Sequence, residues 1–276
     1  MSNWTISNIP DQTGRIVIVT GANSGIGFEA AKALAEKNAE VIFAVRNLDK
    51  GNAAVTQIQT ENPEANVSLR LLDLANLDSV KTFADQFKAD HTKLDLLINN
   101  AGIMVPPYSK TIDGFESQMG TNHFGHFALT AQLYPLLEAT TGSRIVNVSS
   151  NAHKMGNLNV DDLHWDHRKY APWKAYGDSK IANLYFTHEL TRRLETAGSD
   201  VQVTAAHPGW ASTGLQKSLL LRVLNVFFSQ SGFMGALPTL RAAIQPEVNS
   251  GDYFGPSGIG EVRGYPKLVK SNKLSH

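Results

Sequence analysis

Residues 15–27, with the sequence RIVIVTGANSGIG, join a run of apolar β-branched residues to three closely spaced glycines. The apolar run predicts a buried strand, and the glycines open a helix that continues to about Lys37. A strand, a glycine turn and a helix in this order are typical of dinucleotide binding, because the helix N-terminus presents unpaired N–H groups to a pyrophosphate.

Each glycine of this turn has its own role in that interpretation. Gly21 permits the tight turn, Gly25 lets backbone amides approach a ligand, and Gly27 lets the helix pack against the strand. The spacing is GxxxGxG rather than the commoner GxGxxG, and a plain turn is the alternative. Cofactor contacts are expected from most of the turn, namely Gly21, Asn23, Ser24, Gly25, Ile26 and Gly27.

The composition of the 276-residue chain favours a small-molecule partner. Twenty-five basic residues balance 25 acidic ones without long runs of like charge, which argues against nucleic acid. The absence of cysteine excludes disulfides and thiolate catalysis. Residues 1–14 lack the pattern of a signal peptide, and polar residues interrupt the apolar stretch 215–234. We therefore expect a cytoplasmic protein without a membrane-spanning segment.

Beyond the first helix, predicted strands and helices alternate, which indicates a parallel sheet covered on both faces. Six further strands are predicted, at residues 40–45, 67–72, 94–98, 144–148, 201–206 and 252–254. From Tyr265 onward we expect a loosely ordered polar tail. The predicted fold is a single α/β domain over residues 1–276, a doubly wound Rossmann-type sheet of about seven strands in the order 3-2-1-4-5-6-7.

The strand ends supply further cofactor candidates. Arg46 follows the second strand, where an arginine pairs with a ribose 2′-phosphate and an acid would bind the 2′-hydroxyl. NADP(H) is therefore predicted over NAD(H), with a surface cation as the alternative for Arg46. Asp73 and Leu74 follow the third strand, where a carboxylate suits an adenine amino group, although Asp73 also suits a helix cap.

The sequence NNAG, residues 99–102, follows the fourth strand. Small residues at this place let a ligand lie over the strand end, and the amide side chains can tie neighbouring strands together. We interpret Asn99 as structural and expect Asn100, Ala101 and Gly102 near the cofactor.

A phenol and an ammonium lie four residues apart in AYGDSK, residues 175–180. Four residues are about one helical turn, so Tyr176 and Lys180 share a face of the predicted helix. We expect Lys180 to lower the pKa of Tyr176, which lets the phenol exchange protons with a substrate oxygen. An exposed pair on a solvated face is the alternative, since this spacing occurs by chance in many helices.

Together these motifs resemble the classical short-chain dehydrogenase/reductase family. TGANSGIG, NNAG and YxxxK occur here in the order that the family has, and the resemblance covers nearly the whole chain. The resemblance implies a catalytic Asn122 that holds a water of a proton relay behind the lysine. It implies that Ser150, at the end of the fifth strand, faces the substrate. Pro208 and Gly209 would turn beneath the nicotinamide, and Thr213 would bond its carboxamide or phosphate. A helix amide bonded to its own backbone and a generic turn are the alternatives for Asn122 and for the Pro-Gly pair.

Two segments, residues 151–175 and 210–235, are expected on the substrate side as an insertion and a lid. The first is long and rich in aromatic residues, and the second is apolar, which favours an apolar substrate. A surface flap is the alternative for the insertion. Its length, with NVSSNAH at 147–153 and NLYFTHEL at 183–190, resembles the retinol dehydrogenase and WW-domain oxidoreductase branch. That resemblance implies retinoid, steroid or lipid-aldehyde substrates and leaves a homo-oligomer open.

The predicted reaction is hydride transfer between a nicotinamide and a carbonyl carbon. Tyr176 gives the proton, and Ser150 donates a second hydrogen bond. Tyr176 and Lys180 are also expected to contact the cofactor, with Lys180 bonded to the ribose hydroxyls, and Asn122 connects the lysine through water to solvent. A light-dependent protochlorophyllide reductase, which KAYGDSK also resembles, and a nucleotide sensor without turnover are the alternatives. No metal site is predicted, because the histidine pairs 123/126 and 164/167 lack a third ligand at a suitable spacing.

Overall fold

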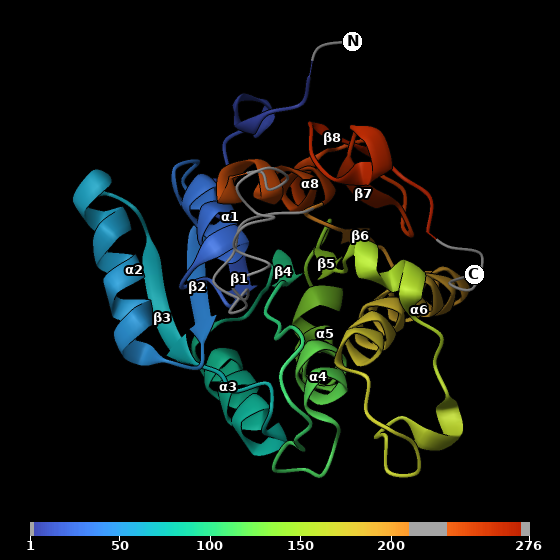
Figure 1. Ribbon diagram of the computed structural model, residues 1–276. Helices are drawn as coiled ribbons and strands as arrows, with labels where there is room; N and C mark the ends of the chain where they lie inside the picture. The colour runs from blue at the N-terminus through green and yellow to red at the C-terminus, as the bar shows by residue number, and fades with distance from the viewer. Residues whose placement is uncertain (1–2, 210–230, 272–276) are drawn as a thin grey trace.

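One eight-stranded sheet organises the computed structural model, which describes residues 3–209 and 231–271 (Figure 1). The strand order is β3-β2-β1-β4-β5-β6-β7-β8. The first seven strands are parallel, and β8 lies antiparallel to β7 at the edge. The predicted fold class and strand order are confirmed. The eighth strand lies in the segment expected to be a loose tail, so that expectation was wrong.

The strands are β1 (Ile16–Thr20), β2 (Glu40–Val45), β3 (Val67–Leu71), β4 (Leu96–Asn99), β5 (Arg144–Val148), β6 (Gln202–Ala206), β7 (Tyr253–Pro256) and β8 (Pro266–Leu268). The longer helices are α1 (Gly25–Ala35), α2 (Leu48–Glu61), α3 (Leu77–Asp90), α5 (Gly125–Glu138), α6 (Pro172–Ala197) and α8 (Gly232–Ile244). Short helical segments are η1 (Ile6–Asn8), α4 (Ser117–Met119), η2 (Gly120–Phe124), η3 (Asn151–Met155), η4 (Val160–Asp162) and η5 (Ile259–Glu261).

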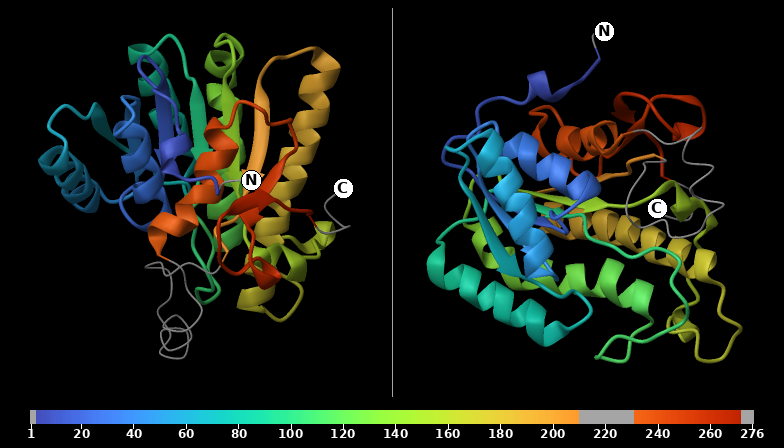
Figure 2. Two further views of the ribbon diagram at one scale, coloured as in Figure 1. Left: turned by 90° about the horizontal axis from the view of Figure 1, so that it is seen from above. Right: turned by 60° about the vertical axis from the view of Figure 1, so that its left-hand side comes forward.

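Helices cover both faces of the sheet, as the right-hand view of Figure 2 shows. Helices α1, α2 and α8 pack on one face, and α3, α5 and α6 pack on the other. Successive residues of β1 point to opposite faces: Val17 and Val19 join the first core, and Ile18 joins the second. Because both faces of the sheet are buried, the strands are continuous apolar runs and do not alternate apolar with polar residues.

Side-chain caps set several helix ends. Asn47 Oδ1 accepts a hydrogen bond from Lys50 N at 2.9 Å, so α2 begins at Leu48, before Asp49. Asn76 caps α3 in the same way. Helix α6 begins at Pro172, three residues earlier than expected, because proline is well suited to the first turn of a helix. The last residues of the predicted insertion 151–175 therefore belong to α6.

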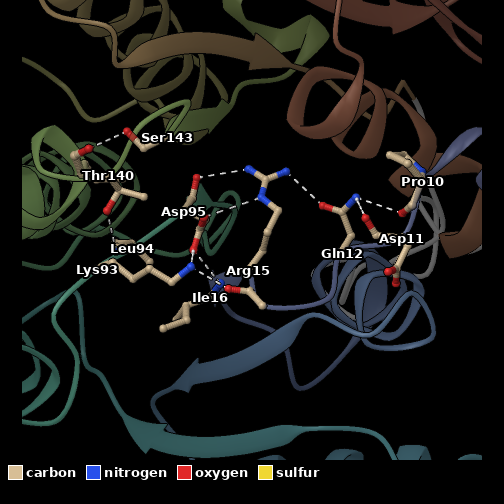
Figure 3. Close-up of polar contacts among 12 residues, drawn as sticks. Pro10, Asp11, Gln12, Arg15, Ile16, Lys93, Leu94, Asp95, Thr140 and Ser143 are labelled. Carbon is tan, nitrogen blue, oxygen red and sulfur yellow. Dashed lines mark hydrogen bonds and ion pairs between the residues drawn. The ribbon is translucent and has the colours of Figure 1, made fainter.

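A network of polar contacts lies at the amino ends of the strands, at the opposite edge of the sheet from the expected site (Figure 3). Asp95 is 8% exposed, and its carboxylate accepts from Ile16 N at 2.9 Å. The same carboxylate pairs with Lys93 at 3.1 Å and, more loosely, with Arg15 at 3.9 Å. Arg15 in turn donates to Gln12 Oε1 at 2.9 Å. These contacts join the starts of β1 and β4 and leave the carboxyl ends of the strands for ligands.

Candidate active site

The glycine turn has the geometry that a dinucleotide requires. Gly21 and Gly25 have φ values of +68° and +58°, which favour glycine. A Cβ at Gly27 would lie 2.4 Å from Asn100 Nδ2 and 2.6 Å from Gly21 O, so no larger residue fits there. The Ser24 hydroxyl makes no cap hydrogen bond with α1. The first N–H groups of this helix are thus available to an anion, and the residues fit a bound pyrophosphate.

Asn100 fixes the end of β4 against this turn. Its Nδ2 donates to Thr20 O at 2.8 Å, and the backbone N–H groups of Asn100 and Ala101 donate to Thr20 Oγ1 at 2.9 Å each. Asn99 Nδ2 instead donates to Asn147 Oδ1 at 2.9 Å and so bridges β4 and β5. The structural interpretation of Asn99 agrees with this geometry.

The other predicted cofactor residues lie along the same edge of the sheet. Arg46 follows β2 directly and is exposed. Asp73 Oδ1 accepts from Ala75 N at 3.0 Å, whereas the cap of α3 comes from Asn76, so Asp73 is not the helix cap. Leu74 is buried at 5% exposure among the side chains of the second core, and its carbonyl oxygen packs against Gly125.

Tyr176, Lys180 and Ser150 come together at the carboxyl end of β5. The Ser150 hydroxyl lies close enough to the Tyr176 phenol to lower its pKa. Lys180 Nζ lies 5.8 Å from the centroid of the Tyr176 ring and donates to Val148 O at 3.1 Å. Ser149, next to Ser150, is buried, and its hydroxyl donates to Lys180 O at 2.8 Å. Ser149 is therefore directed into the core, and the role of Ser150 toward a substrate stays a prediction.

Asn122 lies in η2, a single turn of π-helix between α4 and α5. Such turns are rare and are frequent at functional sites. Asn122 Oδ1 accepts from Ile103 N at 2.8 Å, and its Nδ2 donates to Ile103 O at 3.0 Å and to Ser179 Oγ at 2.9 Å. A Cβ at Gly102 would lie 3.1 Å from Asn122 Oδ1 and 3.5 Å from Lys180 Nζ. The asparagine and the lysine thus flank the same glycine.

Burial decides the protonation of the central pair. It raises the pKa of Tyr176 to about 12, against a smaller lowering by the Ser150 hydroxyl. It also lowers the pKa of Lys180 to about 8. The expectation that Lys180 lowers the tyrosine pKa is therefore wrong for the protein alone, because the loss of hydration of the phenolate outweighs a cation 5.8 Å from the ring. Tyr176 is a protonated hydrogen-bond donor at neutral pH.

Two supporting side chains, Ser179 and His126, were missed as site residues by sequence reasoning. Ser179 Oγ accepts from Asn122 and donates to Tyr176 O at 2.8 Å, so it ties η2 to α6. His126 is 2% exposed and lies between Thr20 Oγ1 at 2.9 Å and Asn122 O at 3.0 Å. Burial lowers the pKa of His126 to about 3, so the ring is neutral. The four-residue spacing of Asn122 and His126 was the only signal in the sequence.

The remaining predictions have mixed outcomes. Thr213 and most of the expected lid at 210–235 lie outside the described residues, so their roles stay predictions. His164 and His167 do not share a helix, because residues 163–171 are turns, bends and coil. In the described parts of the chain, no group of three histidines, aspartates or glutamates is arranged to hold a metal. No helix in those same parts is long and apolar enough to cross a membrane.

A doubly wound parallel sheet, a glycine turn after β1, and a Tyr–Ser pair beside a buried lysine together define the class of nicotinamide-dependent oxidoreductases acting on alcohols and carbonyls. The family model described as "short chain dehydrogenase" matches residues 15–222. The chain belongs to this family.

Individual relatives give the same result. The chain is 42% identical over 248 residues to retinol dehydrogenase 12 of Mus musculus, covering 87% of this chain and 77% of the relative. It is 43% identical over 268 residues to retinol dehydrogenase 11 of Homo sapiens, covering 95% and 83%. A crystal structure of an uncharacterized protein from Mycobacterium paratuberculosis superposes with a TM-score of 0.84 at 43% identity, covering 99% of this chain and 91% of that one. Within the short-chain dehydrogenases, the chain is thus similar to retinol dehydrogenases.

Proposed function

We propose that the protein is an NADP(H)-dependent oxidoreductase that interconverts an apolar aldehyde or ketone with its alcohol. The observation that carries the proposal is that the side chains of Tyr176 and Ser150 lie together at the end of β5, on the same carboxyl edge of the sheet as the glycine turn. Two hydroxyls at one place suit a carbonyl oxygen, which accepts two hydrogen bonds. The relatives named retinol dehydrogenase support the same reaction type.

In this mechanism the chain binds and polarises the carbonyl. When bound, the nicotinamide supplies the hydride for reduction or accepts it during oxidation. Tyr176 and Ser150 donate hydrogen bonds to the carbonyl oxygen, and Tyr176 then transfers its proton to that oxygen as negative charge develops. Lys180, fixed by Val148 O, places a positive charge behind the phenol as it loses its proton. Asn122 holds the backbone of Ile103 beside the same lysine.

Two observations support an apolar substrate. Met155 and Trp173 lie close in sequence to Ser150 and Tyr176, and they are 51% and 39% exposed. Large apolar side chains left exposed near a reaction centre are suited to an apolar ligand. Retinol, named in the relatives, is a molecule of this kind.

The function is tested by a steady-state screen of cofactor consumption over retinal, steroid ketones, medium-chain aldehydes and quinones, in the dark, with NADPH and with NADH. We expect turnover of at least one apolar carbonyl compound with NADPH. Cofactor binding without turnover over the whole panel would instead favour a nucleotide sensor. A requirement for light would favour the protochlorophyllide reductase alternative.

Arg46 carries the proposed preference for NADPH. Its exposed position directly after β2 suits a ribose phosphate, and a short chain dehydrogenase from Escherichia coli CFT073, 27% identical with a TM-score of 0.59, was solved with NADPH. We expect Arg46→Ala to raise KM for NADPH about tenfold, because a charge-assisted hydrogen bond to phosphate is lost. KM for NADH should stay within about twofold, since NADH lacks that phosphate.

The matched control is Lys50→Ala, which removes an exposed cation from the first turn of the neighbouring helix α2. This variant should leave both KM values unchanged. Equal efficiency of the wild-type protein with NADPH and NADH would refute the assigned role of Arg46.

A further inference from the structure

A short segment near the C-terminus contacts both sides of the proposed nicotinamide site. We call residues 259–262, between β7 and β8, the C-terminal strap (Figure 1, red). The strap contains η5 and lies more than a hundred residues after Ser150 in the sequence. Its central residue, Glu261, is a carboxylate for which the proposed mechanism has no use.

The strap binds the segment that follows Ser150. Asn151 Nδ2 donates to Gly260 O at 3.0 Å and to Glu261 O at 3.1 Å. Lys154 Nζ lies 3.1 Å from Glu261 Oε2. Through these contacts the strap holds η3, which begins directly after the serine.

The strap also contacts the turn that follows β6. His207 is fully buried, and its Nε2 lies 3.2 Å from Glu261 Oε2, a close polar contact whose angle does not form a hydrogen bond. On the other side of the ring, Nδ1 accepts from Gly209 N at 3.2 Å. Gly209 has a φ of +69°, and a Cβ there would lie 2.3 Å from Val262 O. The backbone of Gly209 is therefore pressed between the histidine and the strap.

These contacts define which nitrogen of His207 carries the proton. The amide of Gly209 is a donor, so Nδ1 must be unprotonated to accept from it. The proton of the neutral ring then lies on Nε2 and faces the carboxylate of Glu261. The contact with His207, together with Lys154, lowers the pKa of Glu261 to about 2, so Glu261 is ionised. Burial lowers the pKa of His207, which keeps its ring neutral.

Other polar groups around His207 agree with this arrangement. The rings of His207 and Tyr253 lie 5.2 Å apart, and the rings of Tyr253 and His153 lie 5.6 Å apart. His153 Nδ1 bonds Ser150 O at 2.6 Å, so its ring is directed to the serine segment. The charged groups that act on His207 are Glu261, on the strap, and Lys154, on η3.

The backbone of the strap is itself strained. Glu261 has a φ of +58°, in the left-handed region that non-glycine residues seldom adopt, and Gly260 has a φ of +63°. Such conformations persist only where the surroundings hold them, and they gather at functional sites. Here the surroundings are the bonds from Asn151, Lys154 and His207.

We propose that Glu261 is a positioning residue for the nicotinamide end of the site. It holds His207 in the Nε2-protonated form, and His207 in turn holds the Gly209 amide. Through Lys154, the same carboxylate fixes the segment after Ser150. The strap thereby sets the spacing between the serine and the turn at Pro208 and Gly209. The inference rests on the proposed function, because that turn matters here only if a nicotinamide lies against it.

The first test measures NADPH binding by fluorescence titration in three variants. Glu261→Ala removes the carboxylate beside His207, and we expect the Kd for NADPH to rise about tenfold, as for loss of one close contact with a charged group. Glu261→Gln keeps an oxygen acceptor without the charge, and we expect partial rescue, with a rise of about threefold. Glu195→Ala, on the exposed side of α6, is the control and should leave Kd unchanged.

The second test uses the protein without cofactor. Long-range nitrogen–proton spectra of histidine-labelled protein distinguish the two neutral forms of the ring, and His207→Gln assigns the signals. We expect the Nε2-protonated form in the wild type and in Glu261→Gln, and a mixture of both forms in Glu261→Ala. A merely structural role for Glu261 would not change the ring form.

The two tests distinguish failure of this inference from failure of the proposed function. Kd values within twofold of wild type in both Glu261 variants, or an Nδ1-protonated His207 in the wild type, would overturn the inference. If Glu261→Ala does not fold, the Kd of Glu261→Gln for NADPH and the ring form of His207 in the wild type decide it. If the wild type binds neither NADPH nor NADH, the proposed function fails, and the spectra still test the placement of the proton.

Discussion

Replacing Tyr176 by phenylalanine is expected to lower kcat for carbonyl reduction about a thousandfold, while the Kd for NADPH stays within about threefold. The substitution removes one oxygen and leaves the ring, which is 8% exposed and packed at the start of α6. The lost hydroxyl is the proposed proton donor, and in the proposed mechanism Ser150 alone then polarises the carbonyl. Steady-state kinetics and a separate NADPH titration measure the two effects.

Tyr185→Phe is the matched control, since Tyr185 lies on the same helix, away from Ser150. It should retain wild-type kcat. Full turnover by the Tyr176→Phe protein would remove Tyr176 from the acid role and with it the mechanism proposed above.

Replacing Lys180 by methionine is expected to change activity and stability in opposite directions. We expect kcat to fall at least a hundredfold, because the positive charge behind Tyr176 is lost. We expect the free energy of unfolding at pH 7 to rise by about 1–3 kcal/mol, because a buried ammonium is replaced by an apolar side chain of similar length. Val148 O, the acceptor of Lys180, keeps a hydrogen bond from Asn183 Nδ2 at 3.2 Å.

The pH dependence of the difference in stability between the wild type and Lys180→Met tests whether the buried ammonium causes it. Burial lowers the pKa of Lys180 to about 8 from 10.5. Between these values the unfolded chain binds more protons at this residue than the folded protein, so the contribution of Lys180 to stability increases as pH rises from about 8 to 10.5. The advantage of the methionine variant should therefore shrink over that window. Urea unfolding of both proteins at pH 7.5 and pH 9.5 measures it.

A contrary result is easily recognised. If the Lys180→Met protein is less stable than the wild type at pH 7.5, the lysine contributes favourable contacts that outweigh its burial. A stability difference that does not change between the two pH values would show that the pKa of Lys180 is not lowered in the folded protein.

Much of the fold followed from local sequence patterns. The order strand, glycine turn, helix at residues 15–35 and the alternation of apolar runs with helices predict a parallel sheet, because each pattern is read within one element or between neighbours. The prediction of secondary structure was wrong where the local sequence has only a weak preference for helix or strand. Strand β8 is three residues long and depends on pairing with β7, so nothing in its own sequence marks it.

Sequence motifs identified the residues that form the candidate site, but they did not predict the protonation of those residues. Tyr176, Lys180 and Ser150 were identified from motifs, and the structure brings them together. The direction of the tyrosine pKa was wrong, because burial depends on how α6 packs over β5 rather than on the four-residue spacing. The contact of Thr20 with His126 joins residues 106 apart in sequence, and no periodicity connects them.

The sequence by itself determined the class of fold, the nucleotide turn and the residues proposed for proton transfer, because these depend on short patterns with a local physical meaning. The tertiary structure alone decided how these residues are supported. The link from Glu261 through His207 to Gly209 exists because the segment after β7 returns across the ends of β5 and β6. Burial, protonation and backbone strain at that link are properties of packing between distant segments, and a linear pattern does not record them.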